Sequence, residues 1–448
     1  MAKALLPRLF ILLLLALPLA PRAEAAKEFN ARSVTLANGL QVVVVENHRA
    51  PIVTQMIFYK VGSSDEHRGK TGLAHFLEHL MFKGTKETPP GGFSRIVAQN
   101  GGSENAFTTA DYTAFYQNVA ADRLALVMKL ESERMNGLVL TDKVVLPERD
   151  VILEERRSRI DNSPAALLNE QVNAALYLNS PYHNPVIGWE SEMRGLTTAD
   201  ALAFYHTWYA PNNAVLVIAG DVSFDEVHRL AEKYYGPIPA RPVPVRQSVE
   251  EPPKVASTHL VMKSARAGEP SWSRSYLAPS YTAGEKQYAY ALEVLAEALG
   301  GGATSRLYRS LVLEKKVALG AGAFYDPGSR GLATFGFYAT PQKGVSIADL
   351  EAAFEPVIKT VLKDGLTQAE VDRAKLRMQR AAVYARDSLD GPARIIGAAL
   401  ATGRSLDDVE SWPDRIGAVT LEQVNAAARL VIHDNVAVTG VLLPEPTS

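Results

Sequence analysis

Residues 73 to 82 read Leu73-Ala-His-Phe-Leu-Glu-His-Leu-Met-Phe82. Two histidines and one glutamate stand in a stretch that is otherwise apolar, which predicts a buried helix. On a helix that turns about 100° per residue, His75, Glu78 and His79 share one arc of about 100°. Burying these groups together is costly unless they are compensated. A divalent cation compensates them directly, whereas the alternative is a hydrogen-bonded polar cluster without a metal.

The spacing His-x-x-Glu-His suits zinc. Two histidines at positions i and i+4 can bind one ion, and a glutamate between them can reach a water molecule on that ion. The order is the inverse of the His-Glu-x-x-His motif of zinc peptidases. We therefore predict one Zn²⁺ per chain, with His75 and His79 as ligands. Glu78 is the predicted catalytic base, which takes the proton of the water that attacks a peptide carbonyl.

Two histidines leave such a site one protein ligand short. The segment Pro147–Arg156 predicts a helix with proline near its start. Its helical spacing places Glu148 and Glu155 on one face. Spacing alone does not choose among Glu148, Glu154 and Glu155 as the third ligand.

Strand signals surround this helical region. β-Branched runs on either side of Asn38-Gly39 predict a hairpin. A further strand is predicted from Val53 to Val61, and the apolar run from Ala214 to Ala219 predicts a buried strand.

The two halves of the chain echo one another. Thr198 opens a predicted helix that leads to Asn213, and Thr420 opens another at the same interval before Asn435. An apolar strand follows each asparagine, which suggests a duplicated α+β unit, with chance similarity as the alternative. Prolines concentrated between residues 236 and 253 favour an extended linker between the halves.

Composition sets the broad class. The chain has 448 residues, 47% of them hydrophobic and 21% charged, as in globular proteins with more than one core. The net charge of −2 gives no electrostatic reason to expect a nucleic acid as partner. The chain has no cysteine, so a metal must be held by histidines and carboxylates.

The N-terminus predicts export. Lys3 and Arg8 precede an apolar run from Leu9 to Ala20, and Ala23-Glu24-Ala25 follows it. This pattern is typical of a signal peptide, here residues 1–25. The run is short for a membrane span, although an uncleaved anchor is the alternative. We expect a secreted protein with no membrane span after cleavage, and the bacterial periplasm as its compartment.

Several motifs together resemble the pitrilysin/insulinase family of zinc peptidases. They are His75–His79, Met81–Thr85, Gly101–Thr108 and Glu148–Glu155. The resemblance covers essentially the whole mature chain. It is closest to the subfamily that contains the β subunit of the mitochondrial processing peptidase and its bacterial relatives.

The resemblance implies roles for residues outside the motif helix. In that family the third ligand follows the second histidine at about the interval that separates Glu155 from His79 in this sequence. Glu148 matches a glutamate that supports the site without binding the metal. The stretch from Gly101 resembles an edge strand, on which Asn105 and Ala106 match residues that contact the substrate backbone. The alternative for this stretch is a glycine-rich turn into an ordinary strand.

The family fold is α+β. The resemblance implies two similar domains, each an antiparallel-rich sheet covered by helices, which face each other across a chamber. We expect a zinc-binding catalytic domain at 26–235, a proline-rich linker at 236–256 and a C-terminal domain at 257–444. The second half has no His-x-x-Glu-His, so it is expected to bind no metal.

One departure from the family pattern concerns the substrate carbonyl. Active members complete the site with an arginine and a tyrosine seven residues apart, and here Val312 and Leu319 stand at those positions. Neither side chain can donate a hydrogen bond to an oxyanion. We therefore expect a homologous, metal-free subunit to supply the Arg/Tyr pair, although Arg306 or Tyr308 is an alternative donor.

The predicted function is hydrolysis of extended or unfolded peptides by a metal-activated water. The alternative is a non-catalytic peptide-binding or chaperone subunit that retains zinc. The other seven histidines show no ligand-like spacing and are predicted to be surface or core residues: His48, His67, His183, His206, His228, His259 and His433.

Overall fold

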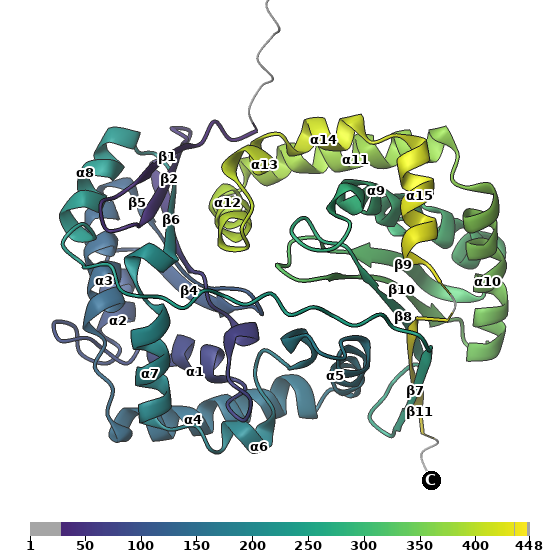
Figure 1. Cartoon of the computed structure of the whole chain (residues 1–448), viewed down its shortest axis with the longest axis horizontal. Coiled ribbons are helices and arrows are strands. Elements are labelled where there is room, and N and C mark those ends of the chain that lie inside the picture. Colours follow the sequence, from purple (N-terminus) through teal and green to yellow (C-terminus); the bar gives the residue numbers. More distant parts are fainter. Residues whose placement is uncertain (1–27, 434, 446–448) are drawn as a thin grey trace, which may run out of the picture.

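A computed structural model describes residues 28–433 and 435–445. Two β-sheets lie on opposite sides of the molecule, each flanked by helices (Figure 1). The signal peptide predicted at residues 1–25 lies outside the described residues. Within the described residues, no helix is both long and apolar enough to cross a membrane.

The first sheet has six strands in the order β1-β2-β6-β3-β5-β4. The hairpin predicted at Asn38-Gly39 is confirmed, since β1 and β2 pair antiparallel across this turn. Strand β2 is parallel to β6, and the other pairs are antiparallel. The strands are β1 (Arg32–Thr35), β2 (Gln41–Glu46), β3 (Ile52–Tyr59), β4 (Ser103–Thr108), β5 (Thr113–Ala120) and β6 (Ala214–Gly220).

The second sheet repeats this topology in five strands, in the order β7-β11-β8-β10-β9. Strand β11 is parallel to β7 and antiparallel to β8, as β6 is to β2 and β3. The predicted duplicated α+β unit with mainly antiparallel sheets is therefore confirmed. The strands are β7 (Thr258–Ser264), β8 (Ser271–Ala278), β9 (Ala318–Tyr325), β10 (Ala333–Pro341) and β11 (Val438–Pro444).

Helices of the N-terminal half bury one face of the first sheet, and α1, α2, α3, α7 and α8 contribute to that core. Helix α7 begins at Thr198 as predicted, because Thr197 and Asp200 form a capping box at its start. The helices are α1 (Leu73–Leu80), α2 (Gly92–Gln99), α3 (Leu124–Gly137), α4 (Asp142–Arg156), α5 (Pro164–Leu176), α6 (Glu190–Met193), α7 (Thr198–Trp208) and α8 (Phe224–Tyr234).

The predicted start of the helix that carries Glu155 is wrong. Helix α4 begins at Asp142, and Pro147 lies inside it. Thr141 precedes the helix in an extended conformation, and the buried Val145 anchors the first turn in the core. Proline at the sixth position removes only one backbone hydrogen bond, so packing of the first turn outweighs it.

Helices of the C-terminal half form a second core against the other sheet. Helix α15 begins just after Thr420, which caps it, as the sequence echo predicts. The helices are α9 (Ala289–Gly300), α10 (Ile347–Asp364), α11 (Gln368–Asp387), α12 (Gly391–Ala401), α13 (Leu406–Glu410), α14 (Trp412–Ala418) and α15 (Leu421–Val431).

Each sheet takes a helix from the opposite half on its other face. Helix α12 packs on β3 and β6 of the first sheet, and α5 packs on β7 and β11 of the second (Figure 1). In β2, Val42 and Val44 face the first core while Val43 and Val45 face the α12 side. Because both faces are covered, this strand is apolar without alternation.

A polar contact also joins the halves. Tyr182, just after α5, donates its hydroxyl to Asp111 in the β4–β5 turn and accepts a hydrogen bond from the Gly331 N–H at 2.9 Å. The Arg330 N–H donates to the same aspartate at 3.0 Å. The β9–β10 hairpin of the C-terminal half thus holds the turn that follows β4; we call this contact the hairpin latch.

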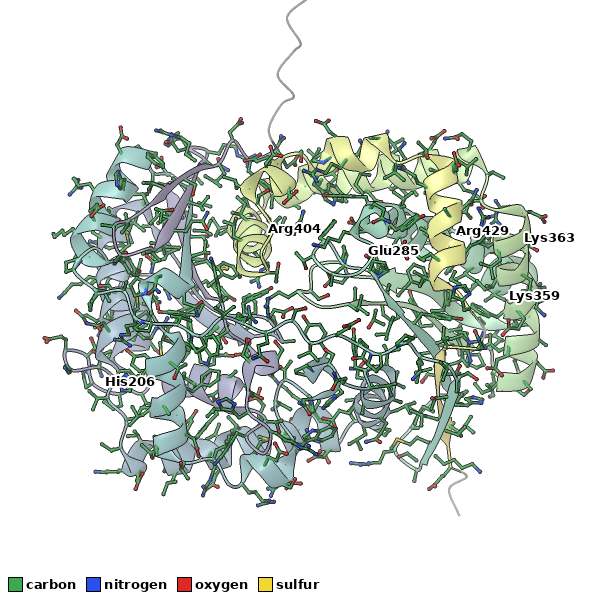
Figure 2. The ribbon with its side chains drawn as sticks, in the orientation of Figure 1. His206, Glu285, Lys359, Lys363, Arg404 and Arg429 are labelled. Atoms are coloured by element: carbon green, nitrogen blue, oxygen red, sulfur yellow. The ribbon has the colours of Figure 1, made fainter. Side chains whose placement is uncertain are left out.

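A partly buried carboxyl lies in the C-terminal half where α14 meets α9. Glu293 on α9 accepts hydrogen bonds from the Tyr281 hydroxyl and from the Trp412 indole N–H, the latter at 3.2 Å. Arg404, labelled in Figure 2, lies 3.9 Å from the centre of the Tyr281 ring. Burial raises the pKa of Glu293 to about 7.

Candidate metal centre

Helix α1 is fixed at its start by a tight backbone contact. Gly72 precedes it with a φ of +86°, and a Cβ there would overlap the Ile187 carbonyl oxygen, so only glycine fits. The buried Glu66 carboxylate accepts hydrogen bonds from the N–H groups of Gly72 and Ala74, at 2.9 and 2.7 Å. These bonds satisfy donors that a helix N-terminus otherwise leaves open.

The structure brings His75, His79 and Glu155 together. The nearest Glu155 oxygen lies 3.2 Å from Nε2 of His79 and 3.7 Å from Nε2 of His75. One potential ligand atom from each residue lies within 4.8 Å of the others. No other group of three or more such residues occurs in the part of the chain that the structure describes.

Glu148 and Glu155 both lie on α4, two turns apart, and contact His79 from opposite sides. Oε1 of Glu148 lies 2.9 Å from Nδ1 of His79, and Lys83 contacts the other oxygen of this carboxylate. This contact assigns a ring proton to Nδ1, so Nε2, which faces Glu155, is the nitrogen that a cation could bind. Glu154, the third candidate from sequence, is largely exposed and pairs with Arg157 at 3.0 Å.

The pKa values of His75 and His79 are shifted in opposite directions by their surroundings. Burial and the neighbouring His79 lower the pKa of His75 to about 4. For His79, burial is outweighed by the hydrogen bonds with Glu148 and Glu155, which raise its pKa to about 9. Without a metal, a proton on His79 links the two carboxylates, and a bound cation has to replace that proton.

Glu78 lies on the same face of α1 but is held by the edge strand. The Thr108 hydroxyl, at the end of β4, donates to Oε2 of Glu78 at 2.5 Å. Burial raises the pKa of Glu78, and this hydrogen bond only partly opposes it. A carboxyl with a raised pKa is better matched to proton transfer near neutral pH.

The donor set fits zinc. Two imidazole nitrogens and one carboxylate oxygen converge, and a further carboxylate stands beside them, as in catalytic zinc sites with an open position. The buried Nδ1 of His75 has no hydrogen-bond partner in the described part of the chain. Nε2 of His75 faces Glu155 instead, and a divalent cation between these groups would offset the cost of burying them.

Asn105 and Ala106 lie on β4, the outermost strand of the first sheet. The Ala106 N–H donates to the side-chain oxygen of Asn105 at 2.8 Å. This N–H is therefore directed away from β5, toward the open edge. The predicted edge strand next to the metal ligands is thus present in the structure.

The two positions at which the family resemblance implies an arginine and a tyrosine offer no hydrogen-bond donor for a substrate carbonyl. Val312 packs against the second core, and Leu319 is half exposed on β9. The guanidinium of Arg306 binds both oxygens of Glu370, at 2.8 and 2.6 Å, and also reaches the Gly365 carbonyl. Arg306 is therefore committed to a structural ion pair and is not a free donor.

A cavity of about 610 Å³ is lined by the three candidate ligands, His75, His79 and Glu155, and by Glu78. It is lined by β4 on one side and by α5 and residues 183–187 on the other. Sequence reasoning missed Thr108 and His183 as members of this site, because no periodic spacing links them to the motif. Arg159 also lines the cavity, and its helical spacing places it on the same face as Glu155, although no role followed from that spacing. A second cavity, of about 710 Å³ between α11, α12 and α14, contains none of the predicted site residues.

Two family models match the chain. The insulinase model (peptidase family M16) covers residues 41–190, and the model described as the M16 inactive domain covers 195–378. The chain is 33% identical to zinc protease PqqE of Helicobacter pylori, over 78% of each chain. It is 30% identical to an uncharacterized zinc protease of Mycobacterium leprae, over 92% of this chain and 91% of the relative.

This chain belongs to the insulinase family, M16. Among solved structures, a protease from Helicobacter pylori superposes with a TM-score of 0.85 at 29% identity, over 92% of this chain and 99% of the other. The resemblance stated from sequence is confirmed. The boundary between the two M16 matches precedes β6, although this strand belongs to the first sheet.

Proposed function

We propose that this chain is a zinc metallopeptidase that hydrolyses extended peptides. The observation that carries the proposal is the convergence of His75, His79 and Glu155 from two helices, with Glu78 beside them. Relatives of similar length bear the name zinc protease, which supports the assignment.

Zinc in this site would polarise the substrate carbonyl and lower the pKa of a water molecule. The residues of the chain do the rest. His75, His79 and Glu155 would hold the ion, and Glu148 fixes the ring of His79. Glu78 accepts a proton from the attacking water and returns it to the leaving nitrogen.

We infer that the substrate binds as an added strand along β4. The outward N–H of Ala106 offers a donor to an extended backbone, once the Asn105 side chain gives way. Strand addition requires a free, extended segment, so unfolded chains and peptides are the expected substrates.

We further infer that a homologous, metal-free subunit completes the site. Val312 and Leu319 cannot donate to an oxyanion, and Arg306 is bound to Glu370. The partner is a chain of this fold with an arginine and a tyrosine seven residues apart. The same absence favours the alternative of a non-catalytic peptide-binding or chaperone subunit that retains zinc.

Location and domain limits complete the proposal. We propose that residues 1–25 direct the chain to the bacterial periplasm. We assign zinc binding and catalysis to 26–235, which is joined by 236–256 to a second domain at 257–444 without metal.

Substitution of the base tests the proposal. Glu78→Gln is expected to retain zinc and to lose activity by at least about a hundredfold, because proton transfer is lost. Zinc is measured by mass spectrometry, and cleavage of a quenched fluorescent peptide is measured with and without chelator. Glu154→Gln, on an exposed glutamate, is the matched control.

The same assay separates the two functions. Full zinc-dependent cleavage by Glu78→Gln removes Glu78 from its role. Addition of the homologous Arg/Tyr subunit is expected to raise the rate of the unmodified chain. No cleavage by the combined subunits, with tight peptide binding retained, favours the chaperone alternative.

A further inference from the structure

The cavity beside the metal ligands has a second wall that the reaction itself does not use. Asn169 and Asn173 line it from α5, and His183 and Asn184 line it from the segment that follows. The opposite wall is β4, along which we place the substrate backbone. A side chain projecting from a peptide on that strand therefore has room of about 610 Å³, in the range of ligand pockets.

This second wall presents free hydrogen-bonding groups. The side chains of Asn169, Asn173 and His183 have no hydrogen-bond partner within residues 28–433 and 435–445. The Asn184 side chain uses its oxygen to accept the Trp189 indole N–H at 3.0 Å, which leaves its amide donors available. Amide groups can both donate and accept, as can a neutral imidazole.

All three carboxyl groups that line the cavity already have partners, and Glu78 accepts the Thr108 hydroxyl at 2.5 Å. Both oxygens of the buried Glu170 accept from the Arg156 guanidinium, at 2.7 and 2.9 Å. Glu155 is a metal ligand in the proposed function and pairs with Arg159 at 2.7 Å. Arg159 also adds a positive charge at the rim, because its side chain is 72% exposed.

We propose that this cavity selects a peptide side chain that ends in an amide or a carboxylate, and disfavours lysine and arginine. Asn169, Asn173 and His183 are the residues that determine this specificity. An amide or carboxylate finds donors in these groups, and a carboxylate also gains from the charge of Arg159. A buried ammonium or guanidinium would lack a free counter-charge, which is costly in a partly desolvated pocket.

The inference rests on the proposed function, because it takes the cavity to be a peptide site. Its test uses binding, so that it does not depend on turnover. The zinc-loaded Glu78→Gln chain is incubated with a randomised peptide pool, and bound peptides are eluted and sequenced by mass spectrometry. We expect Gln, Glu, Asn and Asp to be enriched at one position, with Lys and Arg depleted there by about tenfold.

A negative charge placed in the wall should remove the selection against Lys and Arg. Asn173→Asp, in the Glu78→Gln background, adds a free carboxylate to the cavity and is expected to remove the depletion of Lys and Arg. Gln171→Glu adds the same charge at an exposed position of α5 that does not line the cavity. It is expected to leave the selection unchanged.

The outcomes are distinct. Enrichment of Lys or Arg at the selected position, the absence of any positional preference, or no peptide binding overturns the inference. An equal response to Asn173→Asp and Gln171→Glu also overturns it, since a general charge effect then explains the result. Absence of cleavage by the unmodified chain and its partner, with selective binding intact, refutes the proposed function and leaves the pocket assignment standing.

Discussion

Glu148 contacts the candidate metal site through His79 and is not one of the three proposed ligands. It accepts a hydrogen bond from Nδ1 of His79 at 2.9 Å and is itself held by Lys83. The tautomer and the ring orientation of His79 are thereby set before any ion arrives. The two histidines differ in this respect, because Nδ1 of His75 has no such partner in the described residues.

Removal of this carboxylate should therefore weaken metal binding. Glu148→Ala is expected to lower zinc affinity by about 10- to 100-fold, because the His79 ring is no longer oriented. Glu148→Gln keeps an acceptor without the charge and should lose less. Affinity is measured by competition with a chromophoric chelator, and equal affinity in both variants and the unmodified chain would show that Glu148 is only structural.

At the scale of single elements, β4 provides a direct test of strand addition. The Ala106 N–H is directed to the open edge, away from β5. Ala106→Pro removes this donor at a position where an edge strand tolerates proline. The loss of one hydrogen bond is expected to raise KM by about two- to tenfold.

The controls separate this donor from general damage to the strand. Ala106→Gly keeps the N–H and should leave KM near that of the unmodified chain. Zinc content and thermal stability are measured for both variants. An unchanged KM in a folded, zinc-loaded Ala106→Pro variant would mean that the substrate does not pair with this edge.

Short-range sequence patterns were sufficient to predict those helices and strands whose own residues specify them. The Asn38-Gly39 hairpin and the buried helix at His75–His79 follow from short-range rules, and so do the capped helices after Thr197 and Thr420. The start of α4 was missed, because packing of its first turn outweighs the usual placement of proline. The contact between α12 and the first sheet has no local signal at all, since the partners lie in opposite halves of the chain.

Within the candidate site, too, some residues could be predicted from local sequence and others only from the family resemblance or the fold. His75, Glu78 and His79 share one helix, so helical spacing identifies them together. Glu155 needed the family resemblance, because it lies on a different helix, far along the chain from His79. His183 was predicted to be an ordinary surface or core histidine, but it lines the cavity, and only the fold brings it there.

At the scale of the whole molecule, Glu293 links stability to pH where α14 meets α9. Burial raises its pKa to about 7, while hydrogen bonds from Tyr281 and Trp412 and the charge of Arg404 oppose the rise. The folded state thus holds this proton more tightly than the unfolded chain. Its stabilising contribution is complete below the ordinary value of 4.5 and is lost as pH rises through about 7.

Urea unfolding at pH 5, 6, 7 and 8 measures this contribution. The free energy of unfolding of the unmodified chain, relative to Glu293→Gln, should fall across this range, because the glutamine carries no charge to bury. Glu285→Gln is the control, since Glu285 is exposed (labelled in Figure 2). A constant difference between the unmodified chain and Glu293→Gln would exclude titration of Glu293 in this window.

The hairpin latch connects the C-terminal half to the cavity beside the candidate metal site. Tyr182 bridges Asp111, in the turn that follows β4, to Gly331 of the β9–β10 hairpin. The next residue, His183, lines the cavity, as does the end of β4 at Thr108. One hydroxyl therefore connects both walls of the cavity to the half of the sequence that lacks a His-x-x-Glu-His motif.

Tyr182→Phe removes this hydroxyl and keeps the ring that packs against Tyr177. Leaving Asp111 and the Gly331 N–H short of a partner should cost about 1–3 kcal/mol of stability. KM should rise more than kcat falls, because the walls loosen while the metal ligands on α1 and α4 stay in place, so zinc content should not change. Tyr384→Phe, on a side chain 79% exposed, controls for loss of a hydroxyl elsewhere. If Tyr182→Phe lowers stability with KM unchanged, the latch joins the two halves but does not shape the cavity.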